Sequence, residues 1–465
     1  MALSEIDHGR GARASRLAAL AGRLASRLAA WRHDDSDRSV AQRSAGSAFL
    51  IRVASAGIVF VTQILLARWM GRFEFGIYVS VWAWASVLGP LAALGIAHAA
   101  QRFIPEYRLG GDLDGLRGFL SGSRWLCFGL GAGAGALVAA AVLVSDLVPP
   151  AFVVPFLVCA AILPVFTLSM MQDGIARSFD WVNLALVPLF VVQPVMILAV
   201  MGGLKLFDGP MDAVAALVTA GVAMWLVTLA QTLLLGRRLA GAVPPGRRRH
   251  DLRHWLAVSL PVFVVDGFFL LLFYVDILVL QLYVDPREVA IYYAASKTLS
   301  LVHFISFAVG AAVAHRFSAY HVTGEREKLE GFIADAVRWT FWPTLAFGLL
   351  LIVLGKPILM LFGPGFEAGY PLIAIIMIGL IARGAVGPAE RLLNMTGQQR
   401  LCAVVYAVAL ATNLTLCVVL IPRQGIFGAA WATAGAVVVE SLLLFLVVKR
   451  RLGLHAFVWQ PRRRG

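Results

Sequence analysis

Long apolar runs separated by short polar breaks dominate this chain of 465 residues. A helix that crosses a bilayer needs about 20 mostly apolar residues, and twelve runs reach that length. The breaks between them contain polar residues, glycine or proline, which favour turns. The twelve predicted spans are 46–69, 76–99, 125–145, 151–172, 181–202, 211–235, 255–280, 289–313, 339–361, 369–388, 401–421 and 425–448.

The composition agrees with a membrane protein. Apolar residues make up 60% of the chain and charged residues 14%, whereas a soluble domain has about 45–50% and about 25%. An ordinary soluble enzyme is therefore excluded, and the predicted fold class is an all-α polytopic membrane protein. The four cysteines lie inside apolar runs without metal-ligand spacing, so we predict neither a metal site nor a disulfide framework.

The basic residues gather on one side of the predicted spans. With the N-terminus inside, the inner segments hold 31 of the 40 Lys and Arg residues and the outer loops hold six. Because positive residues favour the cytoplasmic side, both termini are predicted to be cytoplasmic. Such loops face anionic lipid, so the net charge of +14 does not require a nucleic-acid partner.

The segment before the first span has a helical pattern of its own. In residues 9–32, leucines recur at three- and four-residue spacing while arginines occupy another face. This predicts a basic amphipathic helix on the cytoplasmic surface of the membrane. A disordered tail that only follows the charge rule is the alternative.

The chain also matches itself at an offset of 213–214 residues. Arg124-Trp125 corresponds to Arg338-Trp339, and Thr219-Ala220-Gly221 corresponds to Thr433-Ala434-Gly435. Each repeat holds six predicted helices, so both repeats insert in the same orientation and form two bundles about an axis along the membrane normal. The predicted parts are a basic N-terminal segment (1–43), two six-helix bundles (44–240 and 255–452), a cytoplasmic linker (241–254) and a basic tail (453–465).

The sequence lacks several common motifs of soluble enzymes. It contains no phosphate-binding loop, no H-E-x-x-H and no G-x-S-x-G pattern. The predicted outer loops are too short to fold as a catalytic domain. We therefore predict no catalytic residues and no cofactor, and a transporter rather than an enzyme.

Short motifs mark the ends of several predicted helices. They are Ala67-Arg68-x-x-Gly71, Phe75-Gly76-x-Tyr78, Arg102-Phe103-Ile104-Pro105-Glu106-Tyr107, Leu361-Phe362-Gly363, Asn394-x-x-Gly397 and Gly425-x-x-Gly428-Ala429-Ala430-x-Ala432-Thr433. This set resembles the bacterial polysaccharide flippases, which share a superfamily with the multidrug and toxic compound extruders (MATE). The resemblance covers about residues 42–455 and implies a MATE-like fold.

The resemblance also implies a function. Such flippases move a polyprenyl-diphosphate-linked oligosaccharide from the inner to the outer leaflet of the bacterial inner membrane. The product is O-antigen, exopolysaccharide or capsule. The implied partners are the lipid-linked oligosaccharide and membrane lipids, together with a polysaccharide polymerase and glycosyltransferases.

Three cations inside the predicted helices are candidate substrate ligands: Arg52, Lys297 and Arg383. A charge at mid-bilayer costs about 2.5–3.5 kcal/mol, so each such residue is a candidate for function. We predict that they line a cavity between the bundles and bind the diphosphate, since guanidinium and ammonium groups pair well with phosphate. The alternatives are an ion pair of Arg52 with Asp266, its equivalent in the repeat, and extension of Arg383 to the membrane surface.

Two carboxylates inside the seventh span, Asp266 and Asp276, are candidates for coupling transport to a proton or sodium ion. Ion-pair roles are the alternative, and packing or interfacial roles are favoured for His98, His303 and Glu440. Two other functions stay open. A MATE-like exporter of cations should have an acidic cavity, whereas the buried charges here are balanced. A non-transporting scaffold of a polysaccharide assembly complex is disfavoured by the charged positions.

Overall fold

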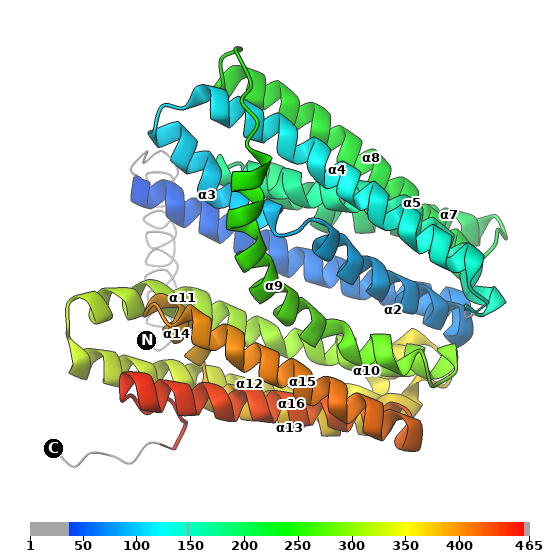
Figure 1. Cartoon of the computed structure of the whole chain (residues 1–465). Helices are drawn as coiled ribbons and strands as arrows, with labels where there is room; N and C mark the ends of the chain where they lie inside the picture. The colour runs from blue at the N-terminus through cyan, green and yellow to red at the C-terminus, as the bar shows by residue number, and fades with distance from the viewer. Residues whose placement is uncertain (1–36, 147, 460–465) are drawn as a thin grey trace, which may run out of the picture. The chain divides into compact units, whose positions relative to one another are not determined.

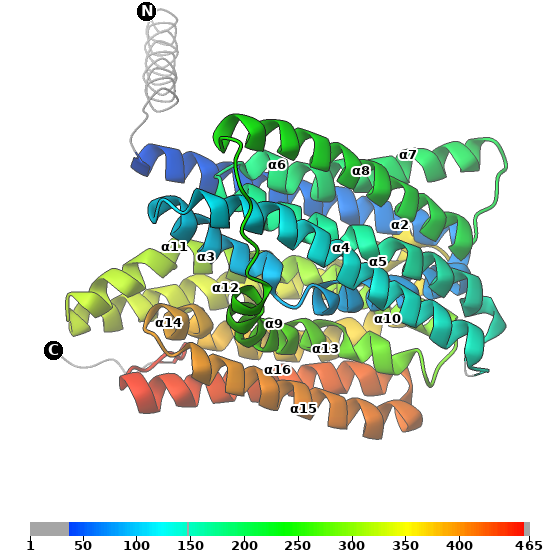
Figure 2. The ribbon, with the colours of Figure 1, turned by 45° about the horizontal axis from the view of Figure 1, so that its top comes forward.

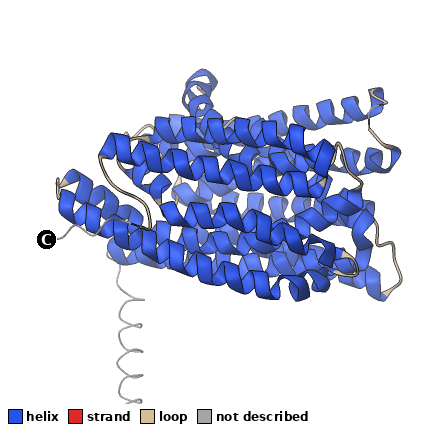
Figure 3. Ribbon diagram, turned by 90° about the horizontal axis from the view of Figure 1, so that it is seen from below, coloured by secondary structure: helices blue, strands red, loops and turns tan. Residues whose placement is uncertain are grey.

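The computed structural model describes residues 37–146 and 148–459, and every regular element in them is a helix (Figure 3). The predicted amphipathic helix 9–32 lies outside the described residues. The elements are α2 (Asp37–Ala92), α3 (Ile96–Leu109), α4 (Leu113–Val144), α5 (Pro150–Ser178), α6 (Val182–Val187), η1 (Pro188–Val192), α7 (Gln193–Leu206), α8 (Ala213–Ala242), α9 (Leu252–Leu280), α10 (Pro286–Leu299), η2 (Ser300–Val302), α11 (His303–Val322), α12 (Arg326–Phe362), η3 (Phe366–Gly369), α13 (Tyr370–Val386), α14 (Ala389–Met395), α15 (Gln399–Gln424), α16 (Ile426–Val447) and η4 (Val448–Leu452).

The chain divides into two compact units, Met1–Arg52 and Val53–Gly465. The described part of the first unit is the beginning of α2. The second unit contains the rest of α2 and all the later helices, and the contacts reported below lie within it.

Candidate membrane spans are numerous in the described part of the chain. Ten helices are long and apolar enough to cross a membrane, or eleven if the bent helix α9 is counted. The first of them, Ile51–Leu109, has 59 residues and is divided by the non-helical Gly71 (φ 77°, ψ 170°). Its two parts match the predicted runs 46–69 and 76–99, so counting them separately gives the twelve spans expected. The prediction of an all-α polytopic membrane protein is confirmed.

The chain reverses direction at Gly71. Thr62 and Tyr78 line the same small cavity, although sixteen positions in a straight helix would separate them by about 24 Å. The positive φ of Gly71 is readily adopted by glycine and by few other residues. The two parts of α2 therefore lie side by side as the first two membrane helices.

Two groups of helices follow the order of the sequence (Figures 1 and 2). In the first half (α2–α8), α5 packs against α3, α4 and α8. In the second half (α9–α16), α13 packs against α12 and α16, and α16 packs against α15. The second membrane helix of each half is interrupted, before α3 in one and at the 3₁₀ turn η2 in the other. One large apolar cluster includes residues of both halves.

Several helices extend beyond the predicted apolar runs on the predicted inner side. Helix α4 begins at Leu113 and α12 at Arg326, about twelve residues before the runs 125–145 and 339–361. Asp112 caps α4 by accepting a hydrogen bond from the Gly115 amide at 2.9 Å. Hydropathy detects only the part of a helix that lies in lipid, so it missed these polar turns.

The beginning of the predicted basic tail is packed rather than free. Leu454 and Ala456 are buried, and the Val458 amide donates to the Ala385 carbonyl oxygen at 3.0 Å. This segment therefore covers the ends of α13 and α16 before the chain leaves the described residues.

Candidate functional site

Helix α9 connects the two halves. It bends by 43° between its parts Leu252–Val264 and Asp266–Leu280. In the first part, the fully buried Trp255 donates from Nε1 to the Tyr107 hydroxyl of α3 at 3.0 Å. Helix α9 also packs against α15 and α16 (Figure 2). The beginning of the predicted second bundle thus packs on the first half.

At the bend, the Asp266 carboxylate pairs with a histidine. Its Oδ2 lies 3.0 Å from Nδ1 of His98, and both side chains are about half exposed. His98 belongs to α3 of the first half, so this pair joins the two halves at the point where α9 changes direction. The sequence predicted a role for Asp266 but favoured a packing or interfacial role for His98.

The two halves meet at the end of the bundle that the topology predicts to be outside. The Phe75 ring contacts Tyr293 at 5.9 Å and Phe366 at 6.2 Å between ring centroids. Gly76 faces the start of α10 so closely that a Cβ atom there would lie 1.8 Å from the Pro286 carbonyl oxygen. Only glycine fits this position in the observed conformation.

Lys297 lies one helical turn from this contact, toward the predicted inner side. It follows Tyr293 by four residues on α10, so both side chains are on the same helix face. The Lys297 ammonium group lies 5.8 Å from the centre of the Tyr293 ring, and Lys297 is half-buried. Among the described residues, no carboxylate lies within ion-pair distance of it.

Asp276 is buried among uncharged hydrogen-bond donors. Its Oδ2 accepts from the Tyr292 hydroxyl at 2.5 Å and from the Thr433 hydroxyl at 3.2 Å, and its Oδ1 accepts from the Ile277 amide at 2.8 Å. The residue is 5% exposed, and no basic group among those described pairs with it. Helices α9, α10 and α16 meet at this carboxylate, which is a candidate site for a proton or a small cation.

Arg383 lies between two carboxylates. It donates to Glu440 of α16 and, at 3.1 Å, to Glu390 of α14. Glu440 is 2% exposed, so this pair is largely shielded from solvent. The structure therefore gives Arg383 acidic partners on two helices, and its predicted role toward the substrate stays a prediction.

We expect Arg383→Ala to destabilise the protein. The change leaves Glu440 buried without its partner, which costs about 3–5 kcal/mol in comparable pairs. Thermal unfolding of the purified protein measures the effect. The control is Arg338→Ala, because Arg338 pairs with Asp335 where both side chains are 52% exposed, and such pairs contribute about 0–1 kcal/mol. Equal melting temperatures for the two variants would contradict this prediction.

The remaining candidate, Arg52, is the last residue of the first unit and is half-buried. Its predicted role as a ligand of the diphosphate stays a prediction. No group of three or more His, Cys, Asp or Glu side chains that could hold a metal ion occurs in the described part of the chain.

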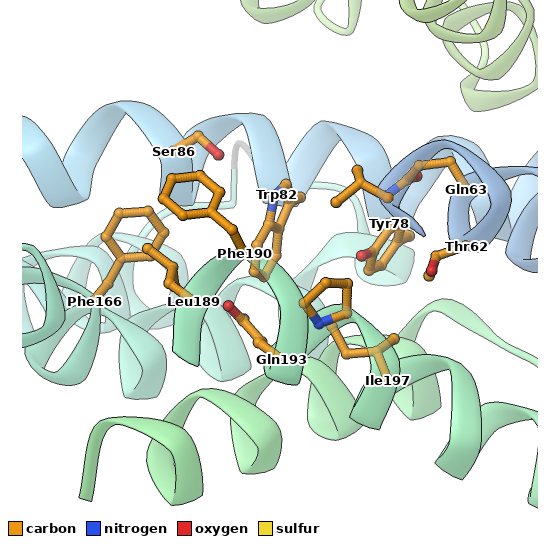
Figure 4. A pocket seen from close by; sticks show the side chains of 12 residues that line it. Thr62, Gln63, Tyr78, Trp82, Ser86, Phe166, Leu189, Phe190, Gln193 and Ile197 are labelled. Atoms are coloured by element: carbon orange, nitrogen blue, oxygen red, sulfur yellow. The ribbon is translucent and has the colours of Figure 1, made fainter. Parts of the chain in front are cut away.

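The first half contains a cavity that sequence reasoning missed. It has a volume of about 210 Å³. Trp82 reaches from α2 toward Phe190 of η1 and Gln193 of α7, as Figure 4 shows. Gln63 and Tyr78, from the two parts of α2, complete its polar side. The only signal in the sequence was a set of polar and aromatic residues at helical spacing, which is typical of ordinary helix packing.

Comparison with known protein families assigns the chain to one of them. The family described as "Polysaccharide biosynthesis protein" matches residues 41–321. The chain belongs to this family. The family described as "MatE" matches residues 261–419, within the second half. No curated protein matches the sequence in a significant pairwise comparison.

Solved structures share the fold. An inward-facing multidrug resistance MATE family transporter of the MOP superfamily has a TM-score of 0.70 and 14% identity, over 87% of this chain and 98% of that one. The lipid II flippase MurJ, in an inward closed conformation, has a TM-score of 0.63 and 17% identity, over 86% and 87% of the two chains. A MOP superfamily transporter from Pyrococcus furiosus, with a binding pocket described as reversed in polarity, has a TM-score of 0.60 and 14% identity, over 89% and 95%. The predicted MATE-like fold is confirmed.

The motifs that carried the family resemblance have structural roles. Gly71 reverses the chain, Gly76 contacts Pro286, and Tyr78 lines the cavity. Gly397 and Gly425 have φ of 78° and 56°, values that favour glycine. The motif residues that resemble this family therefore lie mainly at turns and at contacts between helices.

Proposed function

We propose that this member of the polysaccharide biosynthesis family flips a polyprenyl-diphosphate-linked oligosaccharide from the inner to the outer leaflet of the bacterial inner membrane. The observation that carries the proposal is Lys297, a half-buried cation with no carboxylate within ion-pair distance among the described residues. Its place, directly below the contact between the halves, suits a diphosphate held between them. Such a charge inside a membrane helix is costly unless an anionic ligand balances it.

In this mechanism, the two halves open alternately to each side. The contacts of Phe75 and Gly76 hold the halves together at the predicted outer end, so we propose that the substrate is loaded from the predicted inner side. Lys297 holds the diphosphate as the halves rearrange, while the polyprenyl chain stays in lipid. The bend of α9 and the His98–Asp266 pair lie where the halves must move relative to each other.

Binding and flipping of a labelled polyprenyl diphosphate by the purified protein in lipid vesicles test this function. We expect Lys297→Ala to weaken binding about tenfold or more, because a charge-assisted contact to phosphate is lost. Lys297→Arg should retain binding, and Lys356→Ala removes an exposed lysine of α12 as a matched control. Wild-type affinity in Lys297→Ala would overturn the assignment of this residue, and no flipping by the wild type would overturn the function.

Export of small organic cations is the second candidate function. The specific observations for it are the match of the MatE family to residues 261–419 and the shared fold of the MATE transporter. Efflux of tetraphenylphosphonium from the same vesicles separates the two candidates. Cation efflux without movement of the lipid diphosphate would favour the exporter.

Coupling to an ion gradient belongs to the same proposal. Asp276 combines deep burial with three uncharged donors, so its charge is balanced only when it is protonated or holds a cation. We propose it as the site where a proton or sodium ion binds during transport. A polymerase and glycosyltransferases are the proposed partners in the membrane.

A further inference from the structure

We propose that the cavity of the first half binds one uncharged sugar ring of the transported molecule. The inference extends the proposed function, because it names the part of the oligosaccharide that a defined site recognises. It rests on the size of the cavity, its buried amides, its aromatic rings and the equivalent position in the other half.

The size of the cavity suits a single ring. Sites for drug-sized ligands have volumes of about 300–1,000 Å³, whereas this cavity has about 210 Å³. The turn η1, which is a π-helix, supplies Leu189 and Phe190 to its wall. Single π turns inside α-helices occur frequently at functional sites, since they displace side chains from the regular helical positions.

Two buried amides in the wall have unused hydrogen-bonding atoms. Gln63 and Gln193 are 7% and 4% exposed, and neither Oε1 of Gln63 nor Nε2 of Gln193 has a hydrogen-bond partner in the structure. Leaving such atoms unsatisfied is costly. A ligand that satisfies both must carry a donor and an acceptor, as a sugar hydroxyl group or an N-acetyl group does.

The rest of the wall is aromatic and uncharged. Tyr78 and Trp82 stack with centroids 6.2 Å apart, and Phe166 and Phe190 also line the cavity. Flat apolar rings offer a surface for the CH groups of a pyranose. Aromatic walls also attract organic cations, but a quaternary cation offers no acceptor to the Gln193 amide, and no carboxylate lines the wall.

In the internal repeat, this cavity corresponds in sequence position to the Asp276 cluster of the second half. At an offset of 214 residues, Asp276 and Tyr292 of the second half correspond to Thr62 and Tyr78 of the first. The second half has a buried carboxylate at this position, whereas the first half has a hydroxyl group beside open space. Equivalent positions have therefore become an acidic site in one half and a neutral polar site in the other.

A row of rings links the cavity to Lys297. The centroid of Tyr78 lies 6.1 Å from that of Phe75, Phe75 lies 5.9 Å from Tyr293, and Tyr293 lies 5.8 Å from the Lys297 ammonium group. The sum of these three distances is an upper limit for the separation between Tyr78 of the cavity and the Lys297 ammonium group. A short oligosaccharide attached to a diphosphate has the length to occupy both at once.

Saturation-transfer NMR of the purified protein in lipid nanodiscs tests the cavity with free ligands. The probes are glucose, N-acetylglucosamine, glucuronate and tetraphenylphosphonium. We expect saturable binding of at least one neutral sugar, and binding of glucuronate at least tenfold weaker than that of the best neutral sugar, because no cation lines the cavity. If the wild type binds no neutral sugar, or binds only tetraphenylphosphonium, the proposal is overturned.

Variants locate that binding. Gln193→Met and Trp82→Leu should each weaken it about tenfold. Trp84→Leu is the matched control, since Trp84 is on the same helix, is also partly buried and does not line the cavity. Unchanged sugar binding in both cavity variants overturns the proposal. If one cavity variant fails to fold, sugar binding by the other variant tests the proposal. If both fail to fold, sugar binding by the wild type tests it.

A second comparison separates this proposal from the proposed function. Polyprenyl diphosphate with and without one N-acetylglucosamine is titrated into the same nanodiscs. We expect the sugar to increase affinity about tenfold in the wild type and in Trp84→Leu, and not in Gln193→Met. Equal affinity of the wild type for the two lipids overturns the sugar site but leaves the flippase intact. If the wild type binds neither lipid, the proposed flippase function is contradicted. The measurement with free sugars then still tests the cavity.

Discussion

Asp276→Asn should abolish gradient-driven transport, with a loss of about a hundredfold or more. Asparagine has nearly the shape of aspartate; its oxygen can still accept from the Ile277 amide, and its NH2 group can donate to the Tyr292 hydroxyl oxygen. It has no negative charge, so it neither takes up a proton nor balances a cation. The residue is 5% exposed, where an unbalanced charge costs several kcal/mol. Transport without a gradient should persist, because the substrate is bound elsewhere.

Vesicles with imposed sodium or proton gradients measure this effect, each gradient being applied alone. The wild type should respond to one of them, and that response identifies the ion. Asp335→Asn is the control, because Asp335 is a half-exposed carboxylate on α12. Tyr292→Phe removes one donor but keeps the carboxylate, so it should change the ion concentration needed for half-maximal transport. A full gradient response in Asp276→Asn would remove this residue from the coupling mechanism.

The sequence was sufficient to predict the fold because lipid imposes a simple rule. A spanning helix must satisfy its backbone internally and present apolar side chains, so the spans appear as apolar runs. Glycines at chain reversals, such as Gly71, supplied the breaks. The polar extensions of α4 and α12 escaped this rule, because they lie outside the apolar layer. The bend in α9 escaped it as well, because Pro261 and Gly267, on either side of the bend, lie within one long apolar run and leave no gap in it.

The candidate site was only partly predictable, because charge is visible in a sequence and pairing is not. Arg383 and Glu440 are 57 positions apart, and their contact depends on how α13 packs against α16. The same holds for Asp266, whose partner His98 comes from the other half. Lys297 looked no different from Arg383 in the sequence; only the fold separates a cation with two carboxylates from one with an aromatic ring. A neutral cavity gives no charge signal at all.

Gly76→Val should hold the outer end open. A Cβ atom at this position would lie 1.8 Å from the Pro286 carbonyl oxygen, which is backbone and cannot rotate away. With valine at this position, the first two helices cannot approach α10 as closely as the closed outer end requires. Overpacking of this kind costs about 1–3 kcal/mol, and every 1.4 kcal/mol shifts a two-state equilibrium about tenfold. The shift acts only on the closed outer end, so the population with that end open should rise.

A reporter cysteine at Ser296 measures that shift. Ser296 precedes Lys297 on α10 and is half-buried, whereas the four native cysteines are buried and should give little background. A membrane-impermeant maleimide added outside should label Ser296→Cys about tenfold faster when Gly76→Val is present, and flipping should fall by a similar factor. Gly129→Ala is the control, since a Cβ atom there meets no other atom within 4 Å. Equal labelling rates with and without Gly76→Val would show that this contact does not close the outer end.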